Sequence, residues 1–237
     1  MPDPATRAGR MHSSAHRWMG GDCQPPCRAA RRPRLIQILA LVAYALSAGA
    51  ALAGPRPPVN SLLEIRREQV VIQDWDLSCG AAALATILNY QHGDPVSERE
   101  IASALIRRGE YIEHPELVLI RQGFSLLDLK RYVEQRGYAG IGYGKLHLDD
   151  LVEKAPLMVP INLKDYNHFV IFRGMQGNRV LLADPAYGNR TLTVERFLEA
   201  WIEYPQFGQV GFAVARRDGL IPPNQLEPRP RDFVMLR

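Results

Sequence analysis

The apolar residues of the chain follow three successive patterns. An uninterrupted apolar run covers residues 35–53. Between residues 79 and 154 the apolar residues recur every three or four positions, which is the period of helices, and from residue 157 to residue 215 the period is mostly that of strands. Helices that precede strands in this way predict one domain of the α+β class.

Four helices are expected in the first half of that domain. Alanines and very few charges make up the first helix, which begins at Cys79, so this helix is expected to be buried on most sides. Ser97 and Ser125 stand where their side chains can cap the next two helices, and each of these helices ends at a glycine. The helices are expected at residues 79–90, 97–109, 125–137 and 149–154.

Strands are expected in the second half. A segment rich in turn residues, 174–178, joins two of them. In an antiparallel hairpin centred on Gln176, His168 lies directly opposite Asp184 on the partner strand. The strands are expected at residues 157–163, 168–173, 179–184 and 209–215, with a helix at residues 194–201 before the last of them.

The apolar run has the flanks of an export signal. Arg31, Arg32 and Arg34 precede it, and it ends in Ala51-Leu52-Ala53. A positive segment, an apolar segment and an A-x-A site are the parts of a cleavable signal peptide. The run is also just long enough to span a bilayer, so an uncleaved anchor is the alternative, and in both cases this run is the only expected contact with the membrane. We therefore expect export to the periplasm.

Proline-rich segments flank the folded part of the chain. Residues 55–58 read PRPP, and four prolines lie between residues 222 and 230. Such segments are typical of extended linkers. The expected organisation is a leader with the signal at residues 1–53, a linker at 54–69, a folded domain at 70–217 and a Pro-rich tail at 218–237.

The basic character of the chain is confined to the leader. The whole chain has a net charge of +4, but residues 1–34 alone carry seven arginines and two aspartates. From residue 54 onward the net charge is close to zero, at about −1. The exported part therefore lacks the basic surface of a nucleic-acid-binding protein, and we expect no nucleic-acid partner.

The exported part contains a single cysteine, Cys79. Cys23 and Cys27 lie in the leader, and a C-x3-C pair without further ligands is a weak metal signal, so we expect no metal or other cofactor. Cys79 stands at the first turn of a helix, where backbone N–H groups and the helix dipole favour an anion. This position predicts a thiol pKa below the ordinary value, and a buried structural cysteine is the alternative.

His168 and Asp184 supply the other half of a nucleophilic site. The carboxylate can accept the Nδ1 proton of the imidazole, which leaves Nε2 to take a proton from a nucleophile. Each residue alone also has a structural explanation, because a histidine often begins a strand and an aspartate before proline often opens a turn. Together with Cys79 at the start of a helix, however, the pair has the order expected of a papain-like cysteine nucleophile.

Three short motifs resemble the bacteriocin-processing peptidases of the C39 family. Gln73 lies six positions before Cys79 in Q-x5-C-G-x-A, His168 stands in N-H-F-V, and Asp184 precedes Pro185 sixteen residues after the histidine. The resemblance implies a papain-like α+β fold, with N-terminal helices packed on an antiparallel sheet, and a thiol peptidase. It also implies a nucleophile, a base, an orienting carboxylate and an oxyanion donor, which are here Cys79, His168, Asp184 and Gln73.

Two features differ from the best-known members of that family. Many members have aspartate before the Cys-Gly pair, where this chain has Ser78. The best-known members also form part of ABC transporters, whereas this chain has neither a set of membrane spans nor a G-x4-G-K-[ST] loop. In this respect the chain resembles standalone exported C39-like proteins of bacterial functional-amyloid secretion systems.

The sequence therefore predicts an exported cysteine peptidase that cleaves a peptide or protein substrate of a secretion system, with a functional-amyloid pathway implied by the resemblance. Two alternatives stay open. One is a catalytically silent C39-like domain that binds peptides as an export or assembly factor. The other is an acyltransferase that uses the same Cys, His and Asp.

Overall fold

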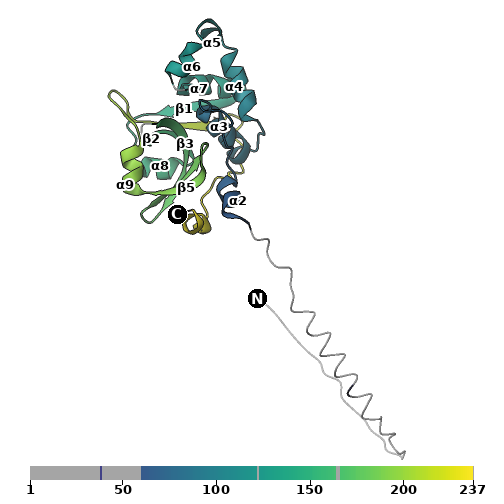
Figure 1. Cartoon of the computed structure of the whole chain (residues 1–237), viewed down its shortest axis with the longest axis vertical. Coiled ribbons are helices and arrows are strands. Elements are labelled where there is room, and N and C mark those ends of the chain that lie inside the picture. Colours follow the sequence, from purple (N-terminus) through teal and green to yellow (C-terminus); the bar gives the residue numbers. More distant parts are fainter. Residues whose placement is uncertain (1–37, 39–59, 122, 164–165, 237) are drawn as a thin grey trace, which may run out of the picture. The chain divides into compact units, whose positions relative to one another are not determined.

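The computed structural model describes residue 38 and residues 60–121, 123–163 and 166–236 (Figure 1). The chain divides into two units, Met1–Pro58 and Val59–Arg237. Apart from Ile38, the expected signal segment lies outside the described residues. Within the part of the chain that is described, no helix is both long and apolar enough to cross a membrane.

An antiparallel sheet of six strands forms the centre of the second unit. The strand order is β1-β8-β2-β3-β4-β5, and β6 and β7 form a separate pair. The strands are β1 (Tyr138–Tyr143), β2 (Leu157–Leu163), β3 (Tyr166–Gln176), β4 (Arg179–Asp184), β5 (Gly188–Thr193), β6 (Glu203–Tyr204), β7 (Gly208–Gln209) and β8 (Gly211–Arg216).

Helices cover both faces of this sheet. Apolar residues of α3, α4 and α7 pack with Met158, Ile171 and Phe212 on one face, and α8 and α9 pack with Val159, Val170 and others on the opposite face. Figure 1 shows α4 to α7 at the top of the unit and α9 at its left, with strands between them. The helices are α2 (Leu62–Arg67), α3 (Cys79–Thr86), the π-helical η1 (Ile87–Gln91), α4 (Glu98–Ile106), α5 (Gly109–Glu113), α6 (Glu116–Ile120), α7 (Leu126–Gln135), α8 (Leu148–Lys154), α9 (Val194–Ala200) and α10 (Pro230–Met235).

The expected α+β architecture is confirmed. All eight residues of α3 are buried, as its alanine-rich sequence predicted. The side chain of Ser97 accepts a hydrogen bond from the backbone N–H of Glu100, and Ser125 and Asp128 form a complete capping box. The sequence did not predict β1, β5 and the short helices α5 and α6.

Secondary structure also lies outside the expected domain limits of residues 70 and 217. Helix α2 lies in the segment expected to be a linker, and α10 lies in the expected Pro-rich tail. Ile65 of α2, together with Phe233 and Leu236 at the C-terminal end, packs on Leu181 of β4. Burial of these side chains is the physical reason why both segments are ordered as helices rather than extended.

The hairpin of β3 and β4 has a different register from the expected one. A two-residue turn, Gly177-Asn178, replaces the expected five-residue loop, and Gln176 pairs with Arg179. The register then shifts between Phe172 and Gly174, so that Arg173 is an extra residue in β3, a β-bulge. Beyond the bulge Phe172 pairs with Leu182, whereas the expected register paired it with Val180.

This bulge decides which face of the sheet the catalytic candidates share. Continued past the bulge, the register puts Asp184 opposite Val170, so that His168 is its diagonal neighbour on the same face. If there were no bulge and Arg173 paired with Leu182, Asp184 would stand opposite Ile171 and on the other face from His168, because side chains alternate along a strand. The expected His168–Asp184 pair thus forms diagonally, not directly across the hairpin.

Replacing Arg173 by methionine should lower the free energy of unfolding by about 3 kcal/mol. Arg173 is only 1% exposed. Its guanidinium donates to the Leu226 carbonyl, to Asn189 Oδ1 and to Gln69 Oε1, over 2.8, 2.8 and 3.3 Å. The variant leaves these acceptors without their donor. Urea denaturation measures the loss, with Arg179→Met in β4 as a control of smaller expected effect; equal losses in the two variants would contradict this explanation.

Candidate active site

Cys79 begins α3 and is 3% exposed. Small residues follow it along the helix, and a Cβ atom added to Gly80 would lie 3.3 Å from both Leu129 and Phe169. Gly80 therefore allows α3 to lie close to β3 and α7.

The loop before Cys79, residues 74–78, is held by a buried carboxylate that sequence reasoning missed. Glu98 is 4% exposed and accepts hydrogen bonds from the backbone N–H of Asp74, at 3.1 and 2.9 Å, and from the Ser78 hydroxyl. Ser78 also contacts the Trp75 carbonyl and does not cap α3. Glu98 thus fixes the loop that leads into the nucleophile.

His168 on β3 and Asp184 at the end of β4 lie together, and both are buried. His168 Nε2 is 3.5 Å from Asp184 Oδ2, longer than a strong hydrogen bond. Hydrogen bonds of this kind are often long before substrate binds. The sequence analysis expected Nδ1 to face the carboxylate, but the structure places Nε2 there. Both ring nitrogens are buried and make no hydrogen bond within the described part of the chain, but Nε2 faces the carboxylate, which leaves Nδ1 for Cys79.

Arg190 of β5 is a second partner of Asp184. Its Nη2 lies 2.8 Å from Asp184 Oδ2, and its guanidinium also lies over the Tyr187 ring. Burial alone would raise the pKa of Asp184, but the hydrogen bond and charge of His168 and the charge of Arg190 hold this pKa below its ordinary value. Asp184 is therefore a carboxylate at neutral pH.

The structure reverses the expected pKa shift of Cys79. Burial raises the pKa of the thiol, and the backbone N–H groups of Phe169 and Gly80 lower it by less. The sequence-based prediction of a lowered pKa was wrong because the helix start lies inside the protein, where loss of water outweighs the helix dipole. Formation of a thiolate here requires a base that takes the proton.

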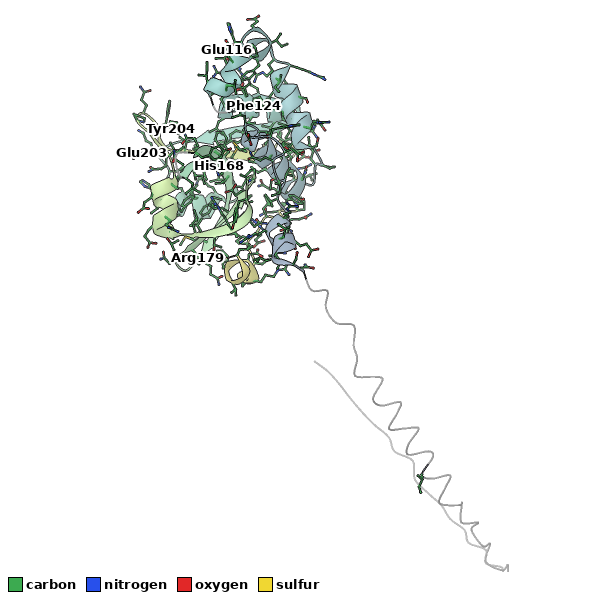
Figure 2. The ribbon with its side chains drawn as sticks, in the orientation of Figure 1. Glu116, Phe124, His168, Arg179, Glu203 and Tyr204 are labelled. Carbon is green, nitrogen blue, oxygen red and sulfur yellow. The ribbon has the colours of Figure 1, made fainter. Side chains whose placement is uncertain are left out.

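A cavity of about 1020 Å³ contains both Cys79 and His168 in its wall. Aromatic side chains contribute much of the remaining surface, among them Phe124, Trp201 and Tyr204. In Figure 2 the label of Phe124 lies above that of His168, and the labels of Tyr204 and Glu203 lie to its left. The cavity is large enough for several residues of a peptide.

Gln73 lies beside this centre but not in the cavity wall as far as the described residues define it. Its backbone N–H donates to the Pro185 carbonyl at 2.9 Å, which ties the loop to the residue after Asp184. Its side-chain Nε2 donates to the Trp75 carbonyl at 2.9 Å and lies 3.4 Å from the Asp76 carbonyl. One of its two amide hydrogens is thus held only weakly.

Replacing Gln73 by alanine should slow acylation of Cys79 by about 10²–10³-fold if the amide serves as an oxyanion donor. The reaction with p-nitrophenyl acetate passes through a tetrahedral oxyanion, whereas alkylation by iodoacetamide does not. The variant should therefore lose rate with the ester and keep its rate with iodoacetamide. Equal rates with the ester in both proteins would remove Gln73 from the mechanism.

Comparison with known proteins places the chain in a family. Residues 67–205 match the model of the Peptidase C39 family. The probable functional amyloid protease FapD of Pseudomonas aeruginosa is 37% identical over 175 residues, which cover 73% of this chain and 74% of that protein. The protein of the same name from Pseudomonas fluorescens is 37% identical over 144 residues, which cover 60% and 61% of the two chains.

Solved structures with a similar arrangement include two peptidase domains. The peptidase domain of Streptococcus ComA is 17% identical, with a TM-score of 0.49, and the match covers 62% of this chain and 98% of that domain. A double glycine motif protease from an AMS/PCAT transporter, solved with its leader peptide, is 22% identical, with a TM-score of 0.42 and coverage of 62% and 90%. The family match and the identity with the Pseudomonas proteins show that this chain belongs to the peptidase C39 family and is a cysteine-type peptidase.

Proposed function

We propose that this peptidase cleaves a protein of a bacterial functional-amyloid system outside the cytoplasm, with Cys79 as nucleophile, His168 as base and Asp184 as orienting carboxylate. The observation that carries the catalytic part is that Cys79 and His168 line one cavity while His168 Nε2 faces the buried Asp184. The names of the Pseudomonas relatives support the choice of substrate.

In the first half of the proposed reaction, His168 Nδ1 takes the proton of Cys79 as Sγ attacks the peptide carbonyl carbon. The negative charge that develops on the carbonyl oxygen is stabilised by Gln73 Nε2–H and by the backbone N–H of Cys79. Collapse of this intermediate breaks the C–N bond, and His168 returns its proton to the leaving amine. The product is a thioester on Cys79.

In the second half, water replaces the amine. His168 Nδ1 accepts a proton from the water as its oxygen attacks the thioester carbon, and the thiol leaves with the proton back on sulfur. Asp184 keeps the imidazole in one orientation and stabilises its cationic form. Hydrolysis, rather than transfer to an amine, distinguishes a peptidase from the alternative acyltransferase.

The test is cleavage of a purified amyloid subunit encoded beside this protein's gene. Mass spectrometry should detect two fragments whose masses sum to the subunit plus one water. Fragments joined to an added amine would support acyl transfer instead. Binding without cleavage would favour the silent export factor.

We further propose that residues 70–217 form the peptidase domain proper, with α2 and α10 as accessory segments. Their packing on β4 supports an accessory role rather than separate domains. The family match, which ends at residue 205, lies almost entirely within these limits.

The exported form should begin at Gly54, because Ala51-Leu52-Ala53 ends the apolar run. Edman sequencing or mass spectrometry of the periplasmic fraction gives the N-terminus. A protein that is recovered only from membranes, with residues 35–53 intact, would establish the anchor alternative. A protein confined to the cytoplasm would refute export.

A further inference from the structure

Tyr166 links the strand that carries the imidazole to the loop that precedes the nucleophile. It is the first residue of β3 and stands two positions before His168, so both side chains lie on one face of the strand. The two rings are 5.0 Å apart and nearly perpendicular, at 80°. The Tyr166 hydroxyl donates to the carbonyl of Asp76 at 2.9 Å.

The phenol remains a hydrogen-bond donor at neutral pH. Burial raises the pKa of Tyr166, and the nearby charges of Cys79, Asp76 and Asp184 raise it further. The side-chain amide of Gln73 acts in the opposite direction but does not cancel this effect. Because a protonated phenol has one hydrogen to donate, that hydrogen occupies the Asp76 carbonyl.

The same carbonyl is the weaker of the two acceptors for Gln73. Nε2 carries two hydrogens, and the contact with the Trp75 carbonyl, at 2.9 Å, accounts for one of them. The second points toward the Asp76 carbonyl over 3.4 Å, where the Tyr166 hydroxyl is already bound at the shorter distance of 2.9 Å. A carbonyl oxygen has two lone pairs and accepts both bonds, so the Tyr166 hydroxyl fixes the position of an acceptor that also holds the Gln73 amide.

We propose that Tyr166 is a positioning residue, which keeps the loop of residues 74–78 docked on β3 and so holds the Gln73 amide, oriented by two carbonyls of that loop, where it serves the oxyanion. The inference rests on the proposed roles of Cys79, His168 and Gln73. Tyr166 acts through Gln73 and does not itself contact the reacting atoms. The contact between the Tyr166 ring and His168 also helps to hold β3 against the loop of residues 74–78.

The experiment compares two reagents on the Tyr166→Phe variant, which keeps the ring and removes the hydroxyl. Acylation by p-nitrophenyl acetate should slow by about tenfold, since one hydrogen bond is lost from the group that aligns the donor. Alkylation by iodoacetamide, which needs the thiolate but no oxyanion donor, should be unchanged. Tyr90→Phe, at the far end of the helical segment that begins at Cys79, is the matched control and should leave both rates unchanged.

A double-mutant cycle separates positioning from a general structural role. In the Gln73→Ala background, Tyr166→Phe should cause no further loss of acylation, because the group through which it acts is absent. Losses that multiply would overturn the inference. So would a Tyr166→Phe variant in which acylation and alkylation fall together with the melting temperature, since that pattern indicates damage to the fold.

Failure of this inference is distinguishable from failure of the proposed function. Acylation that survives Cys79→Ala would remove the nucleophile, and acylation that survives Gln73→Ala would remove the oxyanion donor. When both variants behave as expected and Tyr166→Phe still acylates at the wild-type rate, only the role of Tyr166 is overturned.

Discussion

Replacing Cys79 by alanine is expected to slow peptide hydrolysis by a factor on the order of 10⁶, since the proposed reaction has no other nucleophile. The fold should tolerate the change. Cys79 is followed by Gly80 and three alanines in a fully buried helix, and alanine removes only one heavy atom there. We expect a stability loss of about 1 kcal/mol.

Hydrolysis of the amyloid subunit and release of p-nitrophenolate from the ester give two independent measures of this loss. Cys79→Ser is the matched variant, because it replaces the thiol with a hydroxyl of similar size but far weaker acidity. It should fold and should also be severely impaired. Hydrolysis by Cys79→Ala at a rate near that of the wild type would mean that the chemistry lies elsewhere in the chain.

Replacing His168 by alanine should cause a loss of similar size and should also change how the thiol responds to pH. Burial raises the pKa of Cys79, so without the imidazole the thiolate forms only above the ordinary thiol range of about pH 8.5. In the wild type, transfer of the proton to His168 Nδ1 makes the sulfur reactive at lower pH. Removal of His168 should therefore shift the alkylation profile to higher pH.

The iodoacetamide rate measured from pH 5 to pH 10 tests this expectation. His92→Ala is the control, because His92 is also buried but donates from Nε2 to the Val214 carbonyl on β8, away from the site. Its alkylation profile should match that of the wild type. If His168→Ala also matched the wild type, the imidazole would have no part in thiol activation.

The central strands could be predicted from the sequence and the edge strands could not. Strands β2 and β4 have the expected bounds, because their apolar residues are buried between two layers of helices. The two strands of this sheet that were missed, β1 and β5, lie at its two edges. In β1, a Cβ atom at Gly140 would lie about 3 Å from Lys130 and Phe212. Neighbouring side chains therefore fill the space beside β1, so that glycine stands where an apolar residue would have revealed the strand.

The proximity of His168 and Asp184 could be predicted, but the geometry that produces it could not. The expected register and the observed register differ by two residues, which preserves the face of each side chain. The bulge shifts the alternation in β3 by one residue, but Gly174 has no side chain to mark the shift, and Arg173 reads as an ordinary surface arginine until its buried partners are known. The orientation of the imidazole likewise depends on tertiary contacts.

Residues that support the site were missed for a related reason. Glu98 follows a helix-capping serine, and nothing local reveals that its carboxylate is buried beneath residues 74–78. Arg190 lies on β5, a strand that was not expected. Tyr166 lies two residues before the expected start of its strand, and only the longer observed strand puts it on the face of His168.

The β-bulge at Arg173 ties the hairpin of His168 and Asp184 to the C-terminal part of the chain. Its guanidinium is bonded to the carbonyl of Leu226, and Leu236 accepts hydrogen bonds from Thr191 of β5. The hairpin that brings His168 to Asp184 thus acquires its last partners from a segment that is synthesised after all the catalytic candidates. A chain that emerges from a translocon N-terminus first would remain an inactive precursor until that segment arrives. Proteolysis would then begin only after translocation is nearly complete.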